Sequence, residues 1–284
     1  MEIKETKTVE KTTEKMTERS VPRRTAIVVG ASSGIGRETA LMLASKGWHV
    51  VNVSRTALTG ERVKSVTADA AQEGELTRAI RAVAEEHGLD LLIYSAGFSM
   101  AAPVENAKSG DYRYLFEVNY FGAIEALRAA VPYLKKRGGR AVLVGSLGGD
   151  FPIPYDGFYS SSKAALSMLA READMELRTR GVRVSALLPG GTATDFTYNR
   201  RVYGREEASE YAGAVKKASA ALANMEQGGM NASLVAAAIV KLAEKKNPSP
   251  VVTAGGKNGF LRYVNKLLPE RFVDRMTMRK FNQK

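Results

Sequence analysis

Seven short apolar segments, most of them separated by helical patterns, constrain the fold of this chain more than any other feature. They span residues 25–30, 48–54, 63–68, 89–97, 140–146, 182–190 and 250–255. Helical periodicity occupies residues 38–47, 75–88, 111–136, 158–180 and 231–245. Strands that are apolar throughout and alternate with helices are typical of a parallel sheet buried on both faces. The sequence therefore predicts a single doubly wound α/β domain, a seven-stranded parallel sheet with helices on both sides.

The two ends of the chain differ from this domain, which we place at residues 23–256. Residues 1–22 alternate charged residues with threonine and offer little to bury, which predicts a disordered leader. Residues 257–284 form a basic, amphipathic C-terminal extension. Inside the domain, only about eight residues join the second and third apolar segments, too few for a crossover helix. We expect a loop or a single turn at that point.

Composition excludes several classes of function. No apolar run is long enough for a membrane span, and the first residues lack the apolar region of a secretory signal. The chain has no cysteine, which excludes thiolate metal sites and favours a reducing compartment such as the cytoplasm. The two histidines, His49 and His87, are not placed for a serine triad, and no cluster has metal-ligand spacing. Half of the net charge of +12 lies in residues 257–284, so no nucleic-acid partner is expected for the folded body.

A glycine-rich turn follows the first apolar segment and opens the first helix. It runs Gly-Ala-Ser-Ser-Gly-Ile-Gly from Gly30 to Gly36, so that backbone N–H groups at a helix N-terminus can approach a pyrophosphate. At the end of the second strand, an acid would accept from the ribose hydroxyls of NAD(H), but the chain has Ser54 and Arg55. An arginine suits the 2′-phosphate of NADP(H). We therefore predict dinucleotide binding, with NADP(H) favoured over NAD(H).

Tyr159 and Lys163 lie one helical turn apart at the start of the helix predicted for residues 158–180. Residues four apart share a helix face, which would place the ammonium beside the phenol. A cation at that distance lowers the pKa of a phenol by about 1–3 units. Tyr159 could then exchange a proton near neutral pH. Such a pair also arises by chance, so its significance depends on the other motifs.

The order and spacing of these motifs resemble those of the short-chain dehydrogenases/reductases over residues 24–256. The resemblance rests on the glycine-rich turn, Ala96-Gly97, Asn119, Ser146 and Tyr159-x-x-x-Lys163. It implies a Rossmann fold and a catalytic tetrad of Asn119, Ser146, Tyr159 and Lys163. It also implies that Asp69 lies at the adenine and that the segment from Pro189 to Thr194 meets the nicotinamide and the phosphates. The cofactor-binding residues expected are Gly30, Ser32, Ser33, Gly34, Ile35, Gly36, Ser54, Arg55, Asp69, Ala96, Gly97, Asn119, Tyr159, Lys163, Pro189, Gly190, Thr192 and Thr194.

Each tetrad residue has an expected role in moving a hydride and a proton between a nicotinamide and a carbonyl group. Tyr159 exchanges the proton, and Lys163 tunes Tyr159 and holds the nicotinamide ribose. Ser146, thirteen residues before Tyr159, can donate to the carbonyl oxygen. Asn119 interrupts an apolar helix face, where it either reaches Lys163 through a water molecule or kinks the helix.

Two departures from the family pattern bear on the substrate. Tyr94-Ser95 stand where the family has Asn-Asn, and the end of the sheet lacks the Asp-Gly-Gly of the ketoacyl reductases. The chain instead continues as do longer members that act on steroids, retinoids and other lipophilic carbonyls. We predict an NADP(H)-dependent alcohol dehydrogenase or carbonyl reductase for a lipophilic or ring-shaped substrate. A 3-oxoacyl thioester reductase and a non-catalytic NADPH-binding sensor or scaffold are the alternatives.

Loops at the carboxyl ends of the strands are expected to bind the substrate, and residues 192–230 form a long insertion that would act as its lid. Apolar and aromatic candidates are Phe98, Leu147, Phe151, Tyr155 and Phe196, together with Met100, Pro152, Tyr203 and Tyr211.

The extension at residues 257–284 has apolar residues at helical spacing, Pro269 to start a second helix, and basic side chains on the other face. It can lie peripherally on a membrane, or dock on its own domain or on a sister subunit. The family resemblance implies a homodimer or homotetramer formed through residues 111–136 and 158–180.

Overall fold

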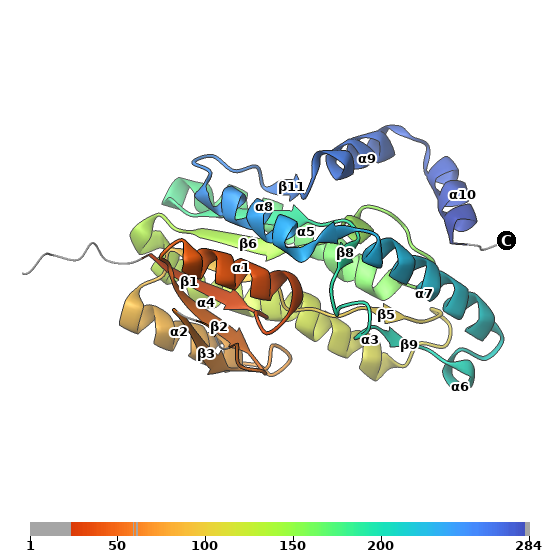
Figure 1. Cartoon of the computed structure of the whole chain (residues 1–284), viewed down its shortest axis with the longest axis horizontal. Coiled ribbons are helices and arrows are strands. Elements are labelled where there is room, and N and C mark those ends of the chain that lie inside the picture. Colours follow the sequence, from red (N-terminus) through yellow and green to blue (C-terminus); the bar gives the residue numbers. More distant parts are fainter. Residues whose placement is uncertain (1–23, 59, 61, 282–284) are drawn as a thin grey trace, which may run out of the picture.

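The computed structural model describes residues 24–58, 60 and 62–281, so the predicted leader at residues 1–22 lies outside the described residues. At its centre is a seven-stranded sheet in the order β11-β7-β6-β4-β1-β2-β3, with all neighbouring strands parallel (Figure 1). The predicted doubly wound α/β fold is confirmed. The strands are β1 (Thr25–Val29), β2 (His49–Ser54), β3 (Val63–Thr67), β4 (Leu91–Tyr94), β6 (Arg140–Val144), β7 (Arg183–Leu188) and β11 (Val251–Thr253).

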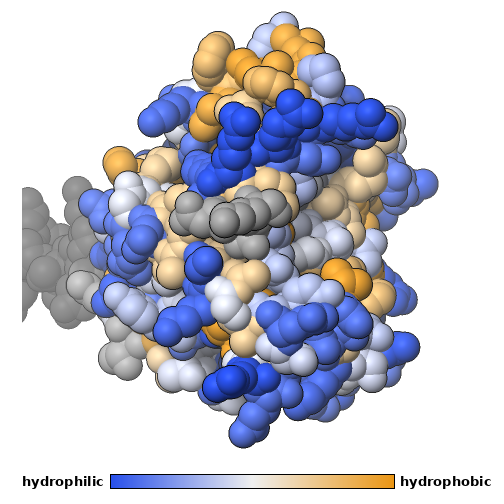
Figure 2. Space-filling model, turned by 90° about the vertical axis from the view of Figure 1, so that its right-hand side faces the viewer, coloured by the Kyte–Doolittle hydropathy of each residue, from blue (hydrophilic) through white to orange (hydrophobic). Residues whose placement is uncertain are grey.

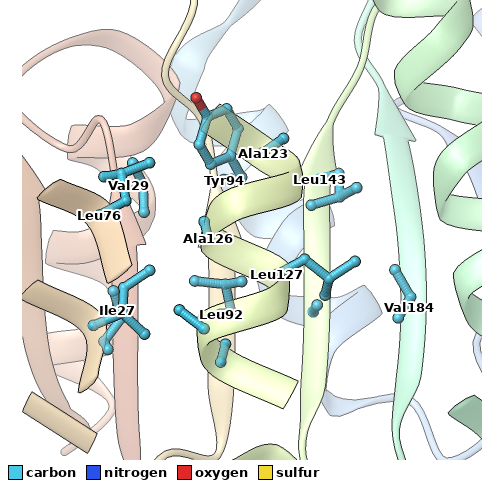
Figure 3. Close-up of a cluster of buried hydrophobic side chains, with 14 of the residues drawn as sticks. Ile27, Val29, Leu76, Leu92, Tyr94, Ala123, Ala126, Leu127, Leu143 and Val184 are labelled. Atoms are coloured by element: carbon cyan, nitrogen blue, oxygen red, sulfur yellow. The ribbon is translucent and has the colours of Figure 1, made fainter. Parts of the chain in front are cut away.

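Helices cover both faces of the sheet because its central strands are apolar on both sides. On one face, α1 (Gly34–Ser45) packs beside α8 (Ala232–Glu244) over a buried cluster that includes Val28 and Ile93. On the other face, α2 (Glu75–His87), α4 (Gly122–Arg137) and α5 (Gly157–Leu177) cover a second cluster, part of which is drawn in Figure 3. Ala123 and Ala126 occupy the side of α4 that faces the strands, and such small side chains let helix and sheet pack closely.

The connections follow the predictions with two differences. The described residues between β2 and β3 form no helix, as expected from the short spacing. Helix α1 begins at Gly34, four residues earlier than predicted, because the end of the glycine-rich turn is itself the first helical turn. Helix α5 spans almost the whole predicted range and ends in a short 3₁₀ turn at residues 178–180.

The helical stretch predicted over residues 111–136 is confirmed, since residues 109–137 are helical without a break, but a π-helical turn lies within it. It consists of α3 (Ser109–Phe116), a π-helical turn η1 (Glu117–Phe121) and α4. At this turn the hydroxyl of the fully buried Tyr94 donates to the carbonyl of Val118. A side chain at Gly122 would lie 2.5 Å from that hydroxyl. The irregular turn therefore accommodates a phenol that reaches across from β4, and π-helical turns often occur at functional sites.

Two segments extend beyond the sheet. Residues 192–230 contain β8 (Thr192–Ala193), β9 (Arg201–Val202), α6 (Arg205–Ala208), α7 (Ala212–Gln227) and β10 (Met230–Asn231). β10 pairs with β8, and β9 pairs with β5 (Met100–Ala101) in the loop after β4. After the edge strand β11, α9 (Gly256–Leu267) and α10 (Glu270–Lys280) meet at Pro269, as predicted.

We call residues 256–281 the tail, and residues 192–230 together with the tail the C-terminal wall. In Figure 1 the two tail helices, drawn in dark blue, stand out from the sheet at the upper right. None of the helices in the described part of the chain is both long and apolar enough to cross a bilayer.

Candidate functional site

A cavity of about 950 Å³ lies at the carboxyl ends of the sheet strands, where open α/β folds bind their ligands. Its inner side is formed by the loops that follow β1, β2, β4 and β6 and by the first turns of α5, which together we call the sheet wall. The C-terminal wall closes the other side. Of the residues expected to bind a cofactor, those that line the cavity are Gly30, Ser32, Ser33, Gly34, Ile35, Ser54, Arg55, Asp69, Ala96, Gly97, Tyr159, Lys163, Pro189, Gly190, Thr192 and Thr194.

The glycine-rich turn forms a cradle for an anion. Gly30 has a φ of 83°, and a side chain there would lie 2.6 Å from the backbone nitrogen of Ala96, so only glycine fits. The first turn of α1 opens toward the cavity and carries no acidic residue, which leaves its N–H groups suited to a pyrophosphate. Gly36 does not line the cavity. A side chain at Gly36 would lie 2.2 Å from the Gly30 carbonyl oxygen, so this glycine lets helix and turn touch.

Asn52, which was not predicted as a site residue, holds the glycine-rich turn in place. Its side chain is fully buried within β2, and its carbonyl oxygen accepts a hydrogen bond from the Ala31 N–H at 3.1 Å. Its amide group donates to the Thr56 carbonyl and to the Ser65 hydroxyl, both at 3.2 Å. The side chain therefore ties the glycine-rich turn to the loop that carries Arg55. The sequence feature that could have indicated this role is a polar residue inside an otherwise apolar strand.

The end of β2 presents a cation to the cavity. Arg55 is exposed, and its guanidinium lies 3.4 Å from the hydroxyl of Tyr114, which lines the same cavity. Arg55 forms no ion pair with any described residue. Asp69 lines the same cavity from the loop after β3, where its carboxylate accepts from the Ala71 N–H at 3.0 Å. The residues present thus fit a dinucleotide, with a helix N-terminus for the pyrophosphate and an unpaired guanidinium for a further phosphate.

Ser146, Tyr159 and Lys163 converge on the cavity from two elements. Ser146 follows β6, and the other two lie on the first turns of α5. The hydroxyl of Tyr159 is hydrogen-bonded to that of Ser146, which also accepts from the Gly148 N–H at 3.0 Å. The Lys163 ammonium donates to the Val144 carbonyl at 3.0 Å and lies 5.8 Å from the centre of the Tyr159 ring.

Burial shifts both titrating groups. It raises the pKa of Tyr159 well above its ordinary value, and the hydrogen bond from Ser146 offsets this in part. It lowers the pKa of Lys163 to about 8. In the chain without a bound cofactor the net shift is therefore upward, because desolvation of the phenol is the largest effect. That Lys163 favours the phenolate stays a prediction. Tyr159 carries its proton at neutral pH.

Asn119 is not among the residues that line the cavity, and its expected place in the catalytic tetrad and at the cofactor stays a prediction. It lies fully buried in η1, where its side-chain oxygen accepts from the Phe98 N–H at 3.0 Å. Its amide group donates to the Phe98 carbonyl at 3.0 Å and to the Ser162 hydroxyl at 3.1 Å. Both amide protons are thus used within the protein, while the side-chain oxygen of Asn119 and the Lys163 ammonium both lie beside Gly97. A water-mediated link between these two groups stays a prediction. Asn119 thereby joins the loop after β4 to α5 from within the π-helical turn.

A buried polar network connects the C-terminal wall to the start of α5, and the sequence analysis missed it. Arg200, in the insertion, pairs with Glu226 and donates to the hydroxyl of Ser99 at 3.1 Å. Ser99 in turn donates to Asp156 at 2.8 Å, and Asp156 precedes α5 by one residue and Tyr159 by three. The second oxygen of Asp156 is buried, and no described residue donates to it. Burial raises the pKa of Asp156 to about 7.

The substrate candidates separate into two groups. Phe98, Leu147, Phe151, Pro152 and Phe196 line the cavity. Tyr155, Met100, Tyr203 and Tyr211 do not, because they pack in or against a separate cluster under the β5–β9 pair.

The position of Tyr155 follows from its backbone. Its φ of 63° turns its side chain toward that cluster, with its ring 6.5 Å from the ring of Tyr211. The ring of Phe196, by contrast, lies 5.7 Å from that of Tyr159.

The tail completes the cavity. Of the three alternatives left open by the sequence, docking on its own domain is what the structure shows for the inner side of α9. Arg262 pairs with Asp150, and the Asn265 amide donates to the Asp150 carbonyl at 2.9 Å. The tail residues that line the cavity are Asn258, Leu261, Val264, Asn265, Leu268, Val273, Met276, Thr277, Lys280 and Phe281. An apolar surface thus faces the polar cluster at Tyr159.

Comparison with known proteins identifies relatives of the chain. Residues 24–202 match the profile of a family described as short chain dehydrogenase. The chain is 31% identical over 228 residues to a 3-ketodihydrosphingosine reductase of Bacteroides thetaiotaomicron, covering 78% of this chain and 84% of that protein. It is 32% identical over 193 residues to human 11-beta-hydroxysteroid dehydrogenase type 2, covering 63% of this chain but only 48% of that protein.

A solved structure has the same fold. The short chain dehydrogenase from Burkholderia cenocepacia in complex with NADP superposes with a TM-score of 0.73 at 24% identity, covering 90% of this chain and 98% of that one. The matching profile ends at residue 202, early in the C-terminal wall.

Proposed function

The chain belongs to the short-chain dehydrogenase family and is an oxidoreductase, and we propose that it interconverts a lipophilic ketone and the corresponding secondary alcohol with NADP(H). One observation carries the proposal. Tyr159, Ser146 and Lys163 meet on the sheet wall of a cavity whose opposite side is apolar. A site of this kind binds a molecule with one reactive oxygen on an otherwise apolar body.

When bound, the reduced nicotinamide supplies the hydride. The Ser146 hydroxyl donates to the substrate carbonyl oxygen and positions it. Tyr159 gives its proton to the same oxygen as the carbon is reduced. Because burial raises the pKa of Tyr159, the phenol enters the reaction protonated, which suits reduction of a ketone. The Lys163 ammonium, held by the Val144 carbonyl, lies close enough to stabilise the phenolate that forms.

Preference for NADP(H) is supported by the end of β2. Arg55 lines the cavity there without an acidic partner among the described residues, and Ser54 beside it donates to the Thr56 carbonyl at 2.6 Å. A guanidinium binds a phosphate through several parallel hydrogen bonds, whereas NAD(H) would leave it without a ligand.

A lipophilic substrate is supported by the tail residues and by the relatives. The names of the two curated relatives denote a ketosphingoid base and a hydroxysteroid, both largely apolar molecules with a ketone or a hydroxyl group. Leu261, Val264 and Leu268 on the tail offer the apolar surface that such a molecule needs.

We also propose that the chain assembles as a homodimer or homotetramer through α4 and α5. These helices leave apolar side chains in solvent: Phe121, at the junction of η1 and α4, is 49% exposed, and Met175 on α5 is 59% exposed. Sedimentation velocity of the purified chain measures the assembly directly, and a monomer at micromolar concentration would contradict it.

The test is oxidation of NADPH and NADH with a panel of steroids, long-chain ketones, quinones and acyl thioesters. Turnover of a lipophilic ketone with NADPH is expected. The Tyr159→Phe variant should lose about 10²- to 10⁴-fold in kcat while it still binds NADPH, because the proton donor is gone. Tyr155→Phe is the matched control and should keep its activity, because Tyr155 lies outside the cavity.

The other outcomes are equally informative. Near-normal turnover by Tyr159→Phe would contradict the mechanism. Tight NADPH binding with no turnover across the panel would favour the sensor or scaffold, and selective turnover of acyl thioesters would favour the 3-oxoacyl thioester reductase.

A further inference from the structure

The tail has apolar side chains that its role at the cavity does not explain. On α9, Leu261, Val264 and Leu268 line the cavity. The neighbouring stripe of the same helix, Phe260, Tyr263 and Leu267, is 68%, 64% and 67% exposed. Three large apolar residues at i, i+3 and i+7 form one continuous stripe, and none of them lines the cavity.

The α10 helix continues this surface. Phe272 is 48% exposed and does not line the cavity, whereas Met276 lines the cavity and is still 55% exposed. Viewed toward the C-terminal end, the molecule has a hydrophobic cap at its top, where α9 lies, above a band of hydrophilic side chains (Figure 2). Contiguous exposed apolar surface rimmed by polar groups is characteristic of an interaction site.

The charge on the tail selects the kind of partner. Residues 256–281 carry seven basic and two acidic side chains. Arg262 is paired with Asp150, whereas Lys257, Lys266, Arg271, Arg275 and Arg279 are exposed and form no ion pair with described residues. A second copy of the tail would bring the same positive charge to the contact and would be repelled. An anionic lipid surface complements both the charge and the apolar stripe.

We propose that the outer surface of the tail, formed by Phe260, Tyr263 and Leu267 with the basic residues of α10, docks on the surface of a membrane that contains anionic lipids. The stripe enters the headgroup region, and the guanidinium and ammonium groups contact lipid phosphates. The contacts of Arg262 and Asn265 with Asp150 hold the opposite side of α9 on the domain, so the orientation of the stripe is fixed.

Docking in this way places the cavity next to the bilayer, because the same two helices line it. Provided that the proposed function is right, a lipophilic ketone can pass from the bilayer to Tyr159 along the inner side of the tail. The two ideas are separable, since docking needs neither cofactor nor ketone.

The experiment is flotation of the full-length chain with vesicles of pure phosphatidylcholine and of phosphatidylcholine mixed with an equal part of phosphatidylglycerol. Binding to the mixed vesicles, and its loss at high salt, are expected. The triple variant Phe260→Ser/Tyr263→Ser/Leu267→Ser should lower the partition coefficient at least tenfold, by roughly the contribution of several buried apolar groups. Each of Arg271→Gln, Arg275→Gln and Arg279→Gln should lower it by roughly fivefold.

Matched controls carry the same chemical changes elsewhere. Val104→Ser removes an 80% exposed valine from the loop before α3. Lys135→Gln/Arg180→Gln/Lys245→Gln removes three exposed charges from the segments that precede β6, β7 and β11, at the amino ends of these strands. Neither control should change vesicle binding. NADPH binding, followed by nucleotide fluorescence, should stay normal in every variant and shows that each one is folded.

Three outcomes would overturn the proposal. The first is failure of the chain to float with the mixed vesicles, and the second is a loss of binding in the control variants as large as that in the tail variants. The third is a change of sedimentation coefficient in the tail triple variant without lipid, which would assign the stripe to a second copy. Ketone turnover measured in detergent-free solution reports on the proposed function independently of all three.

Discussion

The two walls of the cavity are built in different ways. The sheet wall consists of backbone turns packed against one another, as where Gly30 meets Ala96 with no room for a single added carbon. Apart from the short backbone pairing of β9 with β5, the C-terminal wall is attached through side chains, chiefly by the pair of Arg262 with Asp150 and by the Arg200 network. The sheet wall can therefore hold one ligand in one geometry, whereas the C-terminal wall can change its apolar contacts at little cost to the fold. We infer that the sheet wall fixes the chemistry and the C-terminal wall the substrate.

The sharpest test of this contrast is the same substitution in both walls. Gly30→Ala places a carbon 2.6 Å from a backbone nitrogen at a φ of 83°. It should raise the Kd for NADPH by roughly 100-fold, which corresponds to about 2.7 kcal/mol of strain. Gly204→Ala has open space around the new carbon and a φ of −86°, so titration calorimetry should show an unchanged Kd. Equal effects would mean that the walls do not differ in rigidity.

The second prediction concerns which cofactor the sheet wall selects. Arg55→Asp should lower kcat/KM for NADPH by about 10- to 100-fold, the loss expected for charge-assisted hydrogen bonds to a phosphate. The value for NADH should stay the same or rise. Arg37→Asp, a change to an arginine that pairs with Glu38 and does not line the cavity, is the control. Unchanged NADPH preference in Arg55→Asp would remove this residue from the cofactor site.

Most of the sheet wall could be predicted from the sequence because its features are local. A strand, a glycine-rich turn and a helix follow one another within a dozen residues, and the turn must lie at the end of the strand that precedes it. The proximity of Ser146 and Tyr159 could be predicted in the same way. Ser146 lies just beyond β6 and Tyr159 at the start of α5, and the alternating pattern of strands and helices fixes the positions of both elements. The fold follows from the same short-range information.

The C-terminal wall could not be predicted to this extent because its contacts join distant residues. Arg200 and Ser99 are 101 residues apart, and Arg262 and Asp150 are 112 apart. Nothing in either local sequence specifies the partner. The net direction of the pKa shift of Tyr159 could not be predicted for a related reason, since burial depends on everything packed around the phenol rather than on the neighbouring lysine.

The third prediction concerns Asp156, where the network from the C-terminal wall meets α5. Burial raises the pKa of its carboxyl to about 7, above the ordinary 3.8 of the unfolded chain. The folded chain therefore retains a proton that the unfolded chain has lost. The contribution of Asp156 to stability must fall as pH rises from about 4 to about 7, by at most about 1.4 kcal/mol per pH unit.

Asp156→Asn should remove this contribution, because the amide resembles the protonated carboxyl and can still accept from Ser99. Urea unfolding at several pH values measures this contribution. It is the difference between the variant and the unaltered chain in the slope of the free energy of unfolding against pH. Ser99, Arg200 and Glu226 are the polar groups that influence the Asp156 carboxyl. Glu226→Gln therefore serves as a second variant, which changes the network without removing the titrating group. Parallel stability profiles for Asp156→Asn and the unaltered chain would show that the carboxyl does not hold its proton in the folded state.

The smallest effect is expected where the tail is attached, and it bears most directly on the division of labour between the walls. Asp150 and Arg262 are each about one-fifth exposed, so their pairing contributes no more than about 1 kcal/mol. Asp150→Ala should loosen α9 and raise KM for a long-chain ketone by roughly fivefold, the equivalent of that energy. The Kd for NADPH and the KM for a small water-soluble ketone should not change, because neither ligand depends on the tail. Glu210→Ala, which removes an exposed acid from the insertion, is the control. Arg262→Ala and the double variant complete a double-mutant cycle. If the effects of the two single substitutions on KM simply add, the pair does not hold the tail. A loss of NADPH affinity would show that the two walls are coupled and that the C-terminal wall does more than select the substrate.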